Sequence, residues 1–211
     1  MRKTAFVNGE FYHIFNRGTD KRTVFMDNQD FERFLQSLNE FNSLDPIESL
    51  FVNSFREPQL RRRTSKLVNI VCYCLNPNHF HMVLEQVADG GISEFMKRLG
   101  GYTKYFNTKY RRSGVLFQGK FKSRHVDLNE YLLHVSAYVN LNNLVHKIKG
   151  ERFRSSWGEY IGKDKKALCK KSIIISQFKN LKEYNDFTLS SLKDILARKE
   201  LSKELEQMLL E

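Results

Sequence analysis

The chain has 211 residues, 41% of them hydrophobic, with 17 Phe and 9 Tyr. This length and composition suit one well-packed domain with a tail and exclude general disorder. Lys and Arg number 35 against 24 Asp and Glu, so the formal net charge is +11 and favours a polyanionic partner, nucleic acid before a membrane surface. The sequence contains neither an apolar run of about 18 residues nor a secretory signal, so we expect no transmembrane helix and a cytoplasmic location.

The three cysteines, Cys72, Cys74 and Cys169, are an odd number in a chain without an export signal, so a disulfide framework is not expected. No second cysteine pair follows Cys72 and Cys74 to complete a tetrahedral zinc site. Their spacing instead predicts core residues on one face of a strand.

The first elements are a strand over residues 10–17, which ends at Gly18, and a helix capped by Asp27. The apolar residues of this helix recur at helical spacing as far as Phe41. Residues 43–65 contain two prolines and end in three consecutive arginines. They are predicted to form a loop or hairpin extension whose basic end is solvated or contacts phosphate: Arg61, Arg62, Arg63.

Residues 67–75 and 79–87 are β-prone and flank Asn76-Pro77-Asn78, which predicts a hairpin. A helix with apolar residues between positions 92 and 106 follows, weakened by the pair Gly100 and Gly101. Residues 115–126 are predicted to form another strand, in which three basic side chains alternate and therefore share a face: Lys120, Lys122 and Arg124.

The order strand, helix, strand, strand, helix, strand predicts an α+β, ferredoxin-like (RRM-like) antiparallel sheet with helices on one side. A further helix is expected from a cap at Asp127, with Glu130 completing a capping box, to about Lys147. Helical segments are expected at 173–183 and 188–210. We therefore divide the chain into a domain over residues 1–150 and a helical C-terminal extension over residues 151–211.

His79 and His81 alternate at the start of a predicted strand, so both imidazoles point to one face and can share a divalent cation. A polar surface pair is the alternative, and a metal site requires a third ligand. The helix after Asp127 offers Asn142 as a neutral oxygen ligand, which leaves positions open on Mg²⁺ or Mn²⁺ for phosphate oxygens.

Tyr138 precedes Asn142 by four residues and projects from the same side of that helix. Its phenol, with an ordinary pKa of about 10, needs a nearby cation or base to act as a nucleophile. The alternative is a core aromatic residue. Tyr131 lies on roughly the same face and is the second candidate nucleophile, while His134 is either a proton shuttle or a packing residue.

Four segments resemble the single-tyrosine HUH transposases, specifically the REP-associated tyrosine transposase (RAYT) branch, and they come in the family's order. They are YHIFNRG at residues 12–18, NPNHFHMVL at 76–84, FQGKFKS at 117–123 and YVNLN at 138–142. Residues 1–150 are thereby identified as the catalytic domain. One departure is Asn143, where the family usually has proline, so that the helix is expected to continue beyond Asn142.

The resemblance implies that His79, His81 and Asn142 bind the metal and that Tyr138 is the catalytic nucleophile. It also implies a DNA transposase that cleaves and rejoins single-stranded, hairpin-forming DNA through a 5′-phosphotyrosine, without ATP. The expected oligomeric state is a monomer or homodimer. Phosphate contacts are expected from basic residues near the strand ends and loops: Arg17, Arg111, Arg112, Lys120, Lys122 and Arg124.

Three alternatives stay open. The first is a domesticated nuclease that processes chromosomal hairpin repeats by the same chemistry. The second is a non-catalytic module that binds single-stranded nucleic acid or RNA on the sheet, although the expected Gly-Phe-Val type motif is missing. The third is a relaxase or replication-initiation nickase, which usually occurs in larger chains.

Overall fold

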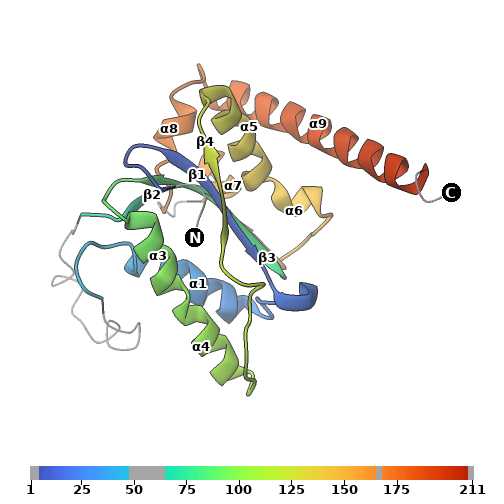
Figure 1. Cartoon of the computed structure of the whole chain (residues 1–211). Coiled ribbons are helices and arrows are strands. Elements are labelled where there is room, and N and C mark those ends of the chain that lie inside the picture. The colour runs from blue at the N-terminus through green and yellow to red at the C-terminus, as the bar shows by residue number, and fades with distance from the viewer. Residues whose placement is uncertain (1–4, 48–64, 165–167, 209–211) are drawn as a thin grey trace.

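The computed structural model describes residues 5–47, 65–164 and 168–208, and side chains as far as residue 202. The Arg61 to Arg63 run lies outside these ranges. Figure 1 shows an antiparallel sheet between two helical layers, which is an α+β fold. The strand order is β4-β1-β3-β2-β5, and the strands are β1 (Phe11–Arg17), β2 (Val68–Asn76), β3 (His79–Gln86), β4 (Lys122–Val126) and β5 (Arg154–Ser155).

The central hairpin of β2 and β3 is confirmed, with Asn76 paired to His79 across a two-residue turn. The backbone that follows β1 donates hydrogen bonds to the carbonyl groups of this turn. Val24 N and Phe25 N donate to the Pro77 carbonyl at 2.7 and 3.0 Å, and Gly18 N donates to the Asn78 carbonyl at 2.8 Å. These bonds fix the position at which β3 begins.

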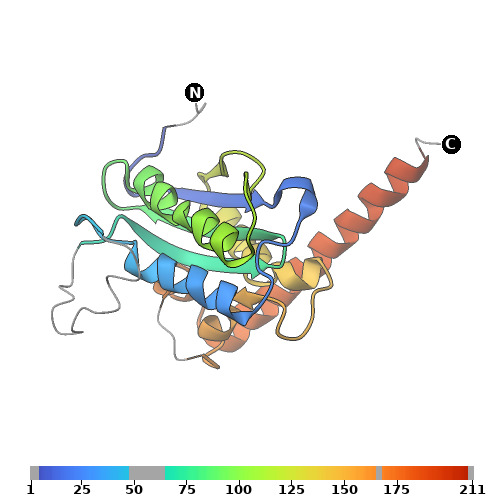
Figure 2. The same cartoon turned by 90° about the horizontal axis from the view of Figure 1, so that it is seen from below.

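One face of the sheet is covered by α1 (Asn28–Glu40), α3 (Gly91–Leu99) and α4 (Gly101–Lys109), which lie toward the viewer in Figure 2. The Asp27 carboxylate caps α1 by accepting a hydrogen bond from Asp30 N, as predicted. The expected single helix at 92–106 is two helices that meet at Gly100, where the glycine pair weakens helical continuity.

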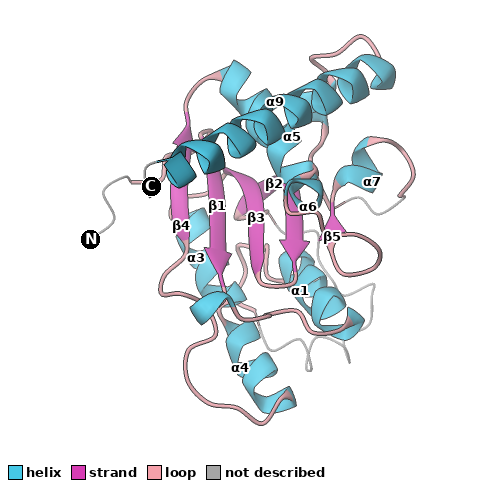
Figure 3. Cartoon of the chain, turned by 90° about the vertical axis from the view of Figure 1, so that its right-hand side faces the viewer, coloured by secondary structure: helices cyan, strands magenta, loops and turns pink. Residues whose placement is uncertain are grey.

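The other face is covered by α5 (Asn129–Asn140), with α9 (Leu181–Met208) packed across it (Figure 3). Shorter helices complete this layer: α6 (Asn142–Val145), α7 (Trp157–Tyr160) and α8 (Ser172–Ile175). Cys72 and Cys74 are free and buried in the core of this face, as predicted. None of the described helices is long and apolar enough to cross a membrane.

Three boundaries predicted for the strand at 115–126 and for the helix after Asp127 were wrong. Only Lys122–Val126 of the strand expected at 115–126 is extended, because the preceding residues form a loop joined to β1 by an isolated bridge between Gly18 and Phe117. Helix α5 is capped at Leu128 without a side-chain bond, so Asp127 is not its cap. The same helix stops before Leu141, where the backbone leaves the helical range and α6 restarts, rather than continuing to Lys147.

A buried carboxylate joins α1 to α4. The Asp30 side chain has no exposed surface, and it accepts hydrogen bonds from Lys109 Nζ at 2.9 Å, Tyr105 Oη at 3.1 Å and Tyr110 Oη at 2.8 Å. A buried carboxylate is tolerated only when charge and hydrogen bonds compensate its desolvation. Lys109 supplies that charge from a side chain that is 21% exposed.

Replacement of Lys109 by Met should lower the free energy of unfolding by about 2–3 kcal/mol, because Asp30 loses its compensating cation. Urea denaturation measures this change. Lys97→Met is the matched control, since Lys97 pairs with Glu94 on the surface and its loss should cost less than about 1 kcal/mol. Equal losses in the two variants would contradict this role of Lys109.

Candidate active site

The hairpin and the α5–α6 junction bring together the four residues expected to carry the chemistry. His79 and His81 lie on the face of β3 that α5 covers, and their ring centroids are 5.2 Å apart. Asn142 Oδ1 lies 3.0 Å from His79 Nε2. The Tyr138 ring packs edge-on against His81 at 5.4 Å. Residues 63 positions apart along the chain thus form one cluster.

The hydrogen bonds around His79 define its tautomer. Asn78 Nδ2 donates to the Lys21 carbonyl at 3.2 Å, which directs Asn78 Oδ1 toward His79 Nδ1 at 2.6 Å. Because an amide oxygen only accepts, His79 Nδ1 carries the proton. His79 Nε2 is therefore an acceptor that faces the cluster.

Two acceptors consequently face each other at 3.0 Å, His79 Nε2 and Asn142 Oδ1. Asn76 Nδ2 donates to both, at 3.0 and 2.7 Å, and so occupies part of the space between them. Neighbouring ligands of an octahedral Mg²⁺, each about 2.1 Å from the ion, are about 3 Å apart. The donor set and this separation therefore fit a small divalent cation. Within the described residues, no group of three or more His, Cys, Asp and Glu side chains could hold a metal.

The charge state of the histidines also suits ligation. Burial lowers the pKa of His79. The Asn142 amide oxygen beside Nε2 acts in the opposite direction because it favours the protonated ring, and the Arg17 guanidinium lowers the pKa further. Burial, followed by the neighbouring histidines, holds the pKa of His81 well below its ordinary value. Both imidazoles are thus neutral at neutral pH, as metal ligation requires.

Tyr138 is a poorly ionised phenol in this environment. Burial raises its pKa, and contact with the Asn142 amide acts in the opposite direction. The phenol is therefore protonated at neutral pH. A nucleophilic role would require its proton to leave as charge develops on the oxygen.

Two cavities adjoin Tyr138, and Phe15, His81 and Tyr138 line both of them. The first, of about 320 Å³, contains the predicted metal ligand His79 together with Arg17 and Lys122. The second, of about 510 Å³, is partly lined by α9. The α9 side chains that line this cavity are Ser191, Asp194, Ile195 and Arg198.

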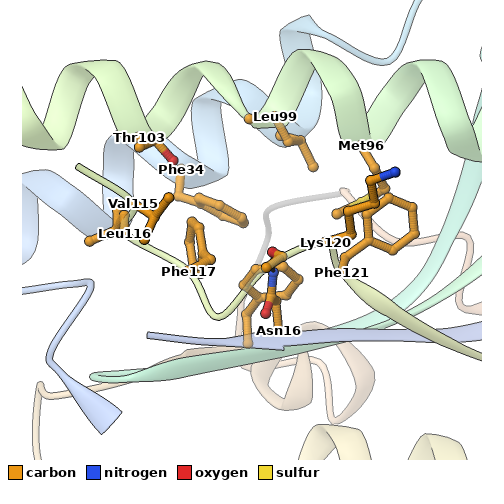
Figure 4. Close-up of a pocket in the computed structure, with 13 residues that line it drawn as sticks. Asn16, Phe34, Met96, Leu99, Thr103, Val115, Leu116, Phe117, Lys120 and Phe121 are labelled. Carbon is orange, nitrogen blue, oxygen red and sulfur yellow. Dashed lines mark hydrogen bonds between the residues drawn. The ribbon is translucent and has the colours of Figure 1, made fainter. Parts of the chain in front are cut away.

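The predicted DNA-contacting residues separate into two groups. Arg17 and Lys122 line the first cavity and Arg124 the second. Lys120 precedes β4 and instead lines an apolar pocket of about 420 Å³ formed with α3 and the 115–121 loop (Figure 4). Arg111 and Arg112 follow α4, on the other side of the sheet, and line neither cavity at Tyr138.

The sequence reasoning missed several residues of the site. His13 lies 2.9 Å from His81, and the His146 ring lies 4.6 Å from that of His79. His13 stands inside the quoted segment at 12–18, and its alternation with Phe15 could have placed it on the site face. His146 follows the unforeseen break at Leu141, so no pattern indicated it. The second candidate nucleophile, Tyr131, lines the cavity beneath α9 and not the one that contains His79, and the Arg124 guanidinium lies over its ring at 5.3 Å.

Residues 61–142 match the model of the family described as "Transposase IS200 like". The matched segment contains the hairpin and α5 and ends at Asn142, so this part of the chain is similar to the IS200-like transposases. No curated protein matches the chain. Among solved structures, it is similar to one described as "Structure of the REP associates tyrosine transposase bound to a REP hairpin". That similarity has a TM-score of 0.49 and 11% identity, and it covers 80% of this chain and 88% of the other.

Because burial lowers the pKa of these histidines, we expect the stability of the fold to decrease in acid. Burial, with a smaller effect of Arg124, lowers the pKa of His13 to about 4 from 6.5. As the pH falls below 6.5, His13 becomes protonated in the unfolded chain but stays neutral in the folded chain. The free energy of unfolding therefore falls, and it levels off near pH 4, where the folded chain is protonated too. The His13 contribution should reach about 3 kcal/mol. Urea denaturation of chelator-treated protein between pH 7 and 4 measures it, and His13→Gln should reduce this pH dependence.

Proposed function

We propose that the chain is a metal-dependent, single-strand-specific DNA endonuclease and strand transferase that uses Tyr138 as its nucleophile. One observation supports this proposal most directly. Tyr138 lies against the His79, His81 and Asn142 cluster and lines the same cavity as Arg17 and Lys122. A nucleophile, a cation site and phosphate-binding cations are the parts that phosphodiester transfer requires.

In the proposed reaction the Tyr138 oxygen forms a bond to a DNA phosphorus, and the bond from phosphorus to the 3′ oxygen breaks. The tyrosyl proton is lost and the departing oxygen gains a proton, so the products are a 5′-phosphotyrosine and a free 3′-hydroxyl. The number of phosphodiester bonds is unchanged, so the reverse reaction can join strands without ATP. Mg²⁺ or Mn²⁺ held by His79, His81 and Asn142 would stabilise charge on the non-bridging phosphate oxygens.

The protein's own side chains would prepare this reaction. Arg17 and Lys122 would hold the phosphates that flank the scissile bond in the first cavity, and Arg124 would act in the second. Residues 1–150 form the catalytic unit in this proposal, and residues 151–211 contribute α9 beside Tyr138. Hairpin-forming single strands are the proposed substrate, on the resemblance to REP-associated tyrosine transposases.

A domesticated nuclease would use the same residues, so only the DNA next to the gene and its mobility distinguish it from a transposase. A non-catalytic nucleic-acid-binding module is the second candidate. It is favoured by the basic charge alone, and it does not account for the cluster around Tyr138. The relaxase or nickase alternative shares the histidines and tyrosine and would be recognised by its replication or transfer substrate.

Replacement of Tyr138 by Phe should abolish formation of a covalent protein–DNA adduct while leaving DNA binding within about twofold, because the ring and its packing remain. Labelled hairpin DNA from the gene's flanks is incubated with each protein and Mn²⁺. A denaturing gel then measures the covalent adduct, and a native gel measures DNA binding. Tyr131→Phe is the matched control and should form the adduct at the wild-type level. An adduct that survives in Tyr138→Phe and disappears in Tyr131→Phe would transfer the role to Tyr131.

Replacement of Arg17 by Ala should weaken binding of single-stranded DNA and reduce the slope of log K against log salt by about 0.7, the value for one lost phosphate contact. Fluorescence anisotropy across a salt series measures both quantities. Lys97→Ala removes an equal charge from α3, on the opposite side of the sheet, and should leave the slope closer to that of the wild type. Identical slopes in the two variants would show that Arg17 makes no specific phosphate contact.

A further inference from the structure

His13 is a buried histidine with no role in the chemistry described above. It lies in the middle of β1 and is 7% exposed. Its Nε2 atom is 2.9 Å from Nδ1 of His81, on the neighbouring strand. The two rings are nearly parallel, with centroids 5.1 Å apart. His13 therefore contacts a proposed metal ligand, His81, through one ring nitrogen of each residue.

Neighbouring rings hold His13 in this position. Phe15 lies 5.0 Å from it along β1, and the Tyr138 ring meets it edge-on at 6.0 Å. Arg124 is its register partner on β4. A neutral imidazole has one donor and one acceptor nitrogen. His13 can thus accept a hydrogen bond at Nε2 in a way that an imidazolium cannot.

The direction of the hydrogen bond between His13 and His81 decides what His81 can do. If His13 donates, Nδ1 of His81 accepts and its proton resides on Nε2, which then cannot bind a cation. If His81 donates from Nδ1, its Nε2 has a free lone pair. His79 already has the second arrangement, because Asn78 Oδ1 accepts from its Nδ1. Metal-binding histidines generally donate their other N–H to a neighbouring acceptor in this manner.

We propose that His13 is a positioning residue that accepts the Nδ1 proton of His81 and so presents His81 Nε2 to the cation. It acts for His81 as Asn78 acts for His79, and the two acceptors approach from different elements, β1 and the hairpin turn. This inference rests on the proposed function for its metal. The placement of the proton on His81 belongs to the metal-free protein as well.

The first test is Mn²⁺ affinity by isothermal titration calorimetry on the full chain. His13→Leu should weaken binding 10- to 100-fold, the usual effect of removing such an acceptor. His13→Gln should recover most of that affinity, because its amide oxygen can accept near the position of the lost Nε2. His125→Gln is the matched control: His125 is on β4, bonded to Glu10 outside the site, and its variant should bind as the wild type does.

The second test is ¹⁵N-detected NMR of the six histidines in metal-free protein. It should find the His81 proton on Nδ1 in the wild type and in His13→Gln, and a mixture of tautomers in His13→Leu. A proton on Nε2 of wild-type His81, or undiminished Mn²⁺ affinity in folded His13→Leu, would overturn the inference. If wild type binds no Mn²⁺, or if His79→Ala binds it equally well, the proposed metal site fails instead, and the NMR result still decides the role of His13.

Discussion

The geometry of the site depends on one tight turn. Pro77 and Asn78 connect the two central strands, and the backbone that leaves β1 donates three hydrogen bonds to their carbonyls. His79 is the first residue of the strand that follows, so its position is set by a turn rather than by a long loop. Register then places His81 opposite Phe15 and Cys74, beneath α5. The hydrogen-bonded turn thus fixes where the cluster's two histidines lie.

Much of this arrangement could be predicted from the sequence, because it follows from short-range patterns. Alternation along β3 places His79 and His81 on one face, and the turn residues between two β-prone runs predict the hairpin. Tyr138 and Asn142 both face the site as their spacing indicated, although the single helix that this spacing assumed ends before Leu141. These features depend on residues close together in the chain, where backbone geometry limits the choices.

The wrong predictions concern segments whose conformation depends on contacts with distant parts of the chain. The 115–121 segment is β-prone but bonds to Gly18 and Arg17 as a loop, which carries Lys120 away from the face of Lys122. The helix break at Leu141 is not marked by glycine or proline, and the asparagines around it are only a weak signal for a helix end. The contact between His13 and His81 joins residues 68 positions apart, so it required knowledge of strand order.

Gly18 has a consequence for how such a protein could change over generations. A Cβ at this position would collide with the Arg22 carbonyl and approach Val24 Cγ1 to 2.9 Å, just behind the turn. A substitution there would displace the turn and, with it, His79, while every residue of the cluster stayed the same. A copy of the gene could thus lose the proposed cleavage through a position outside the cluster, and a comparison of the cluster residues alone would not reveal the change.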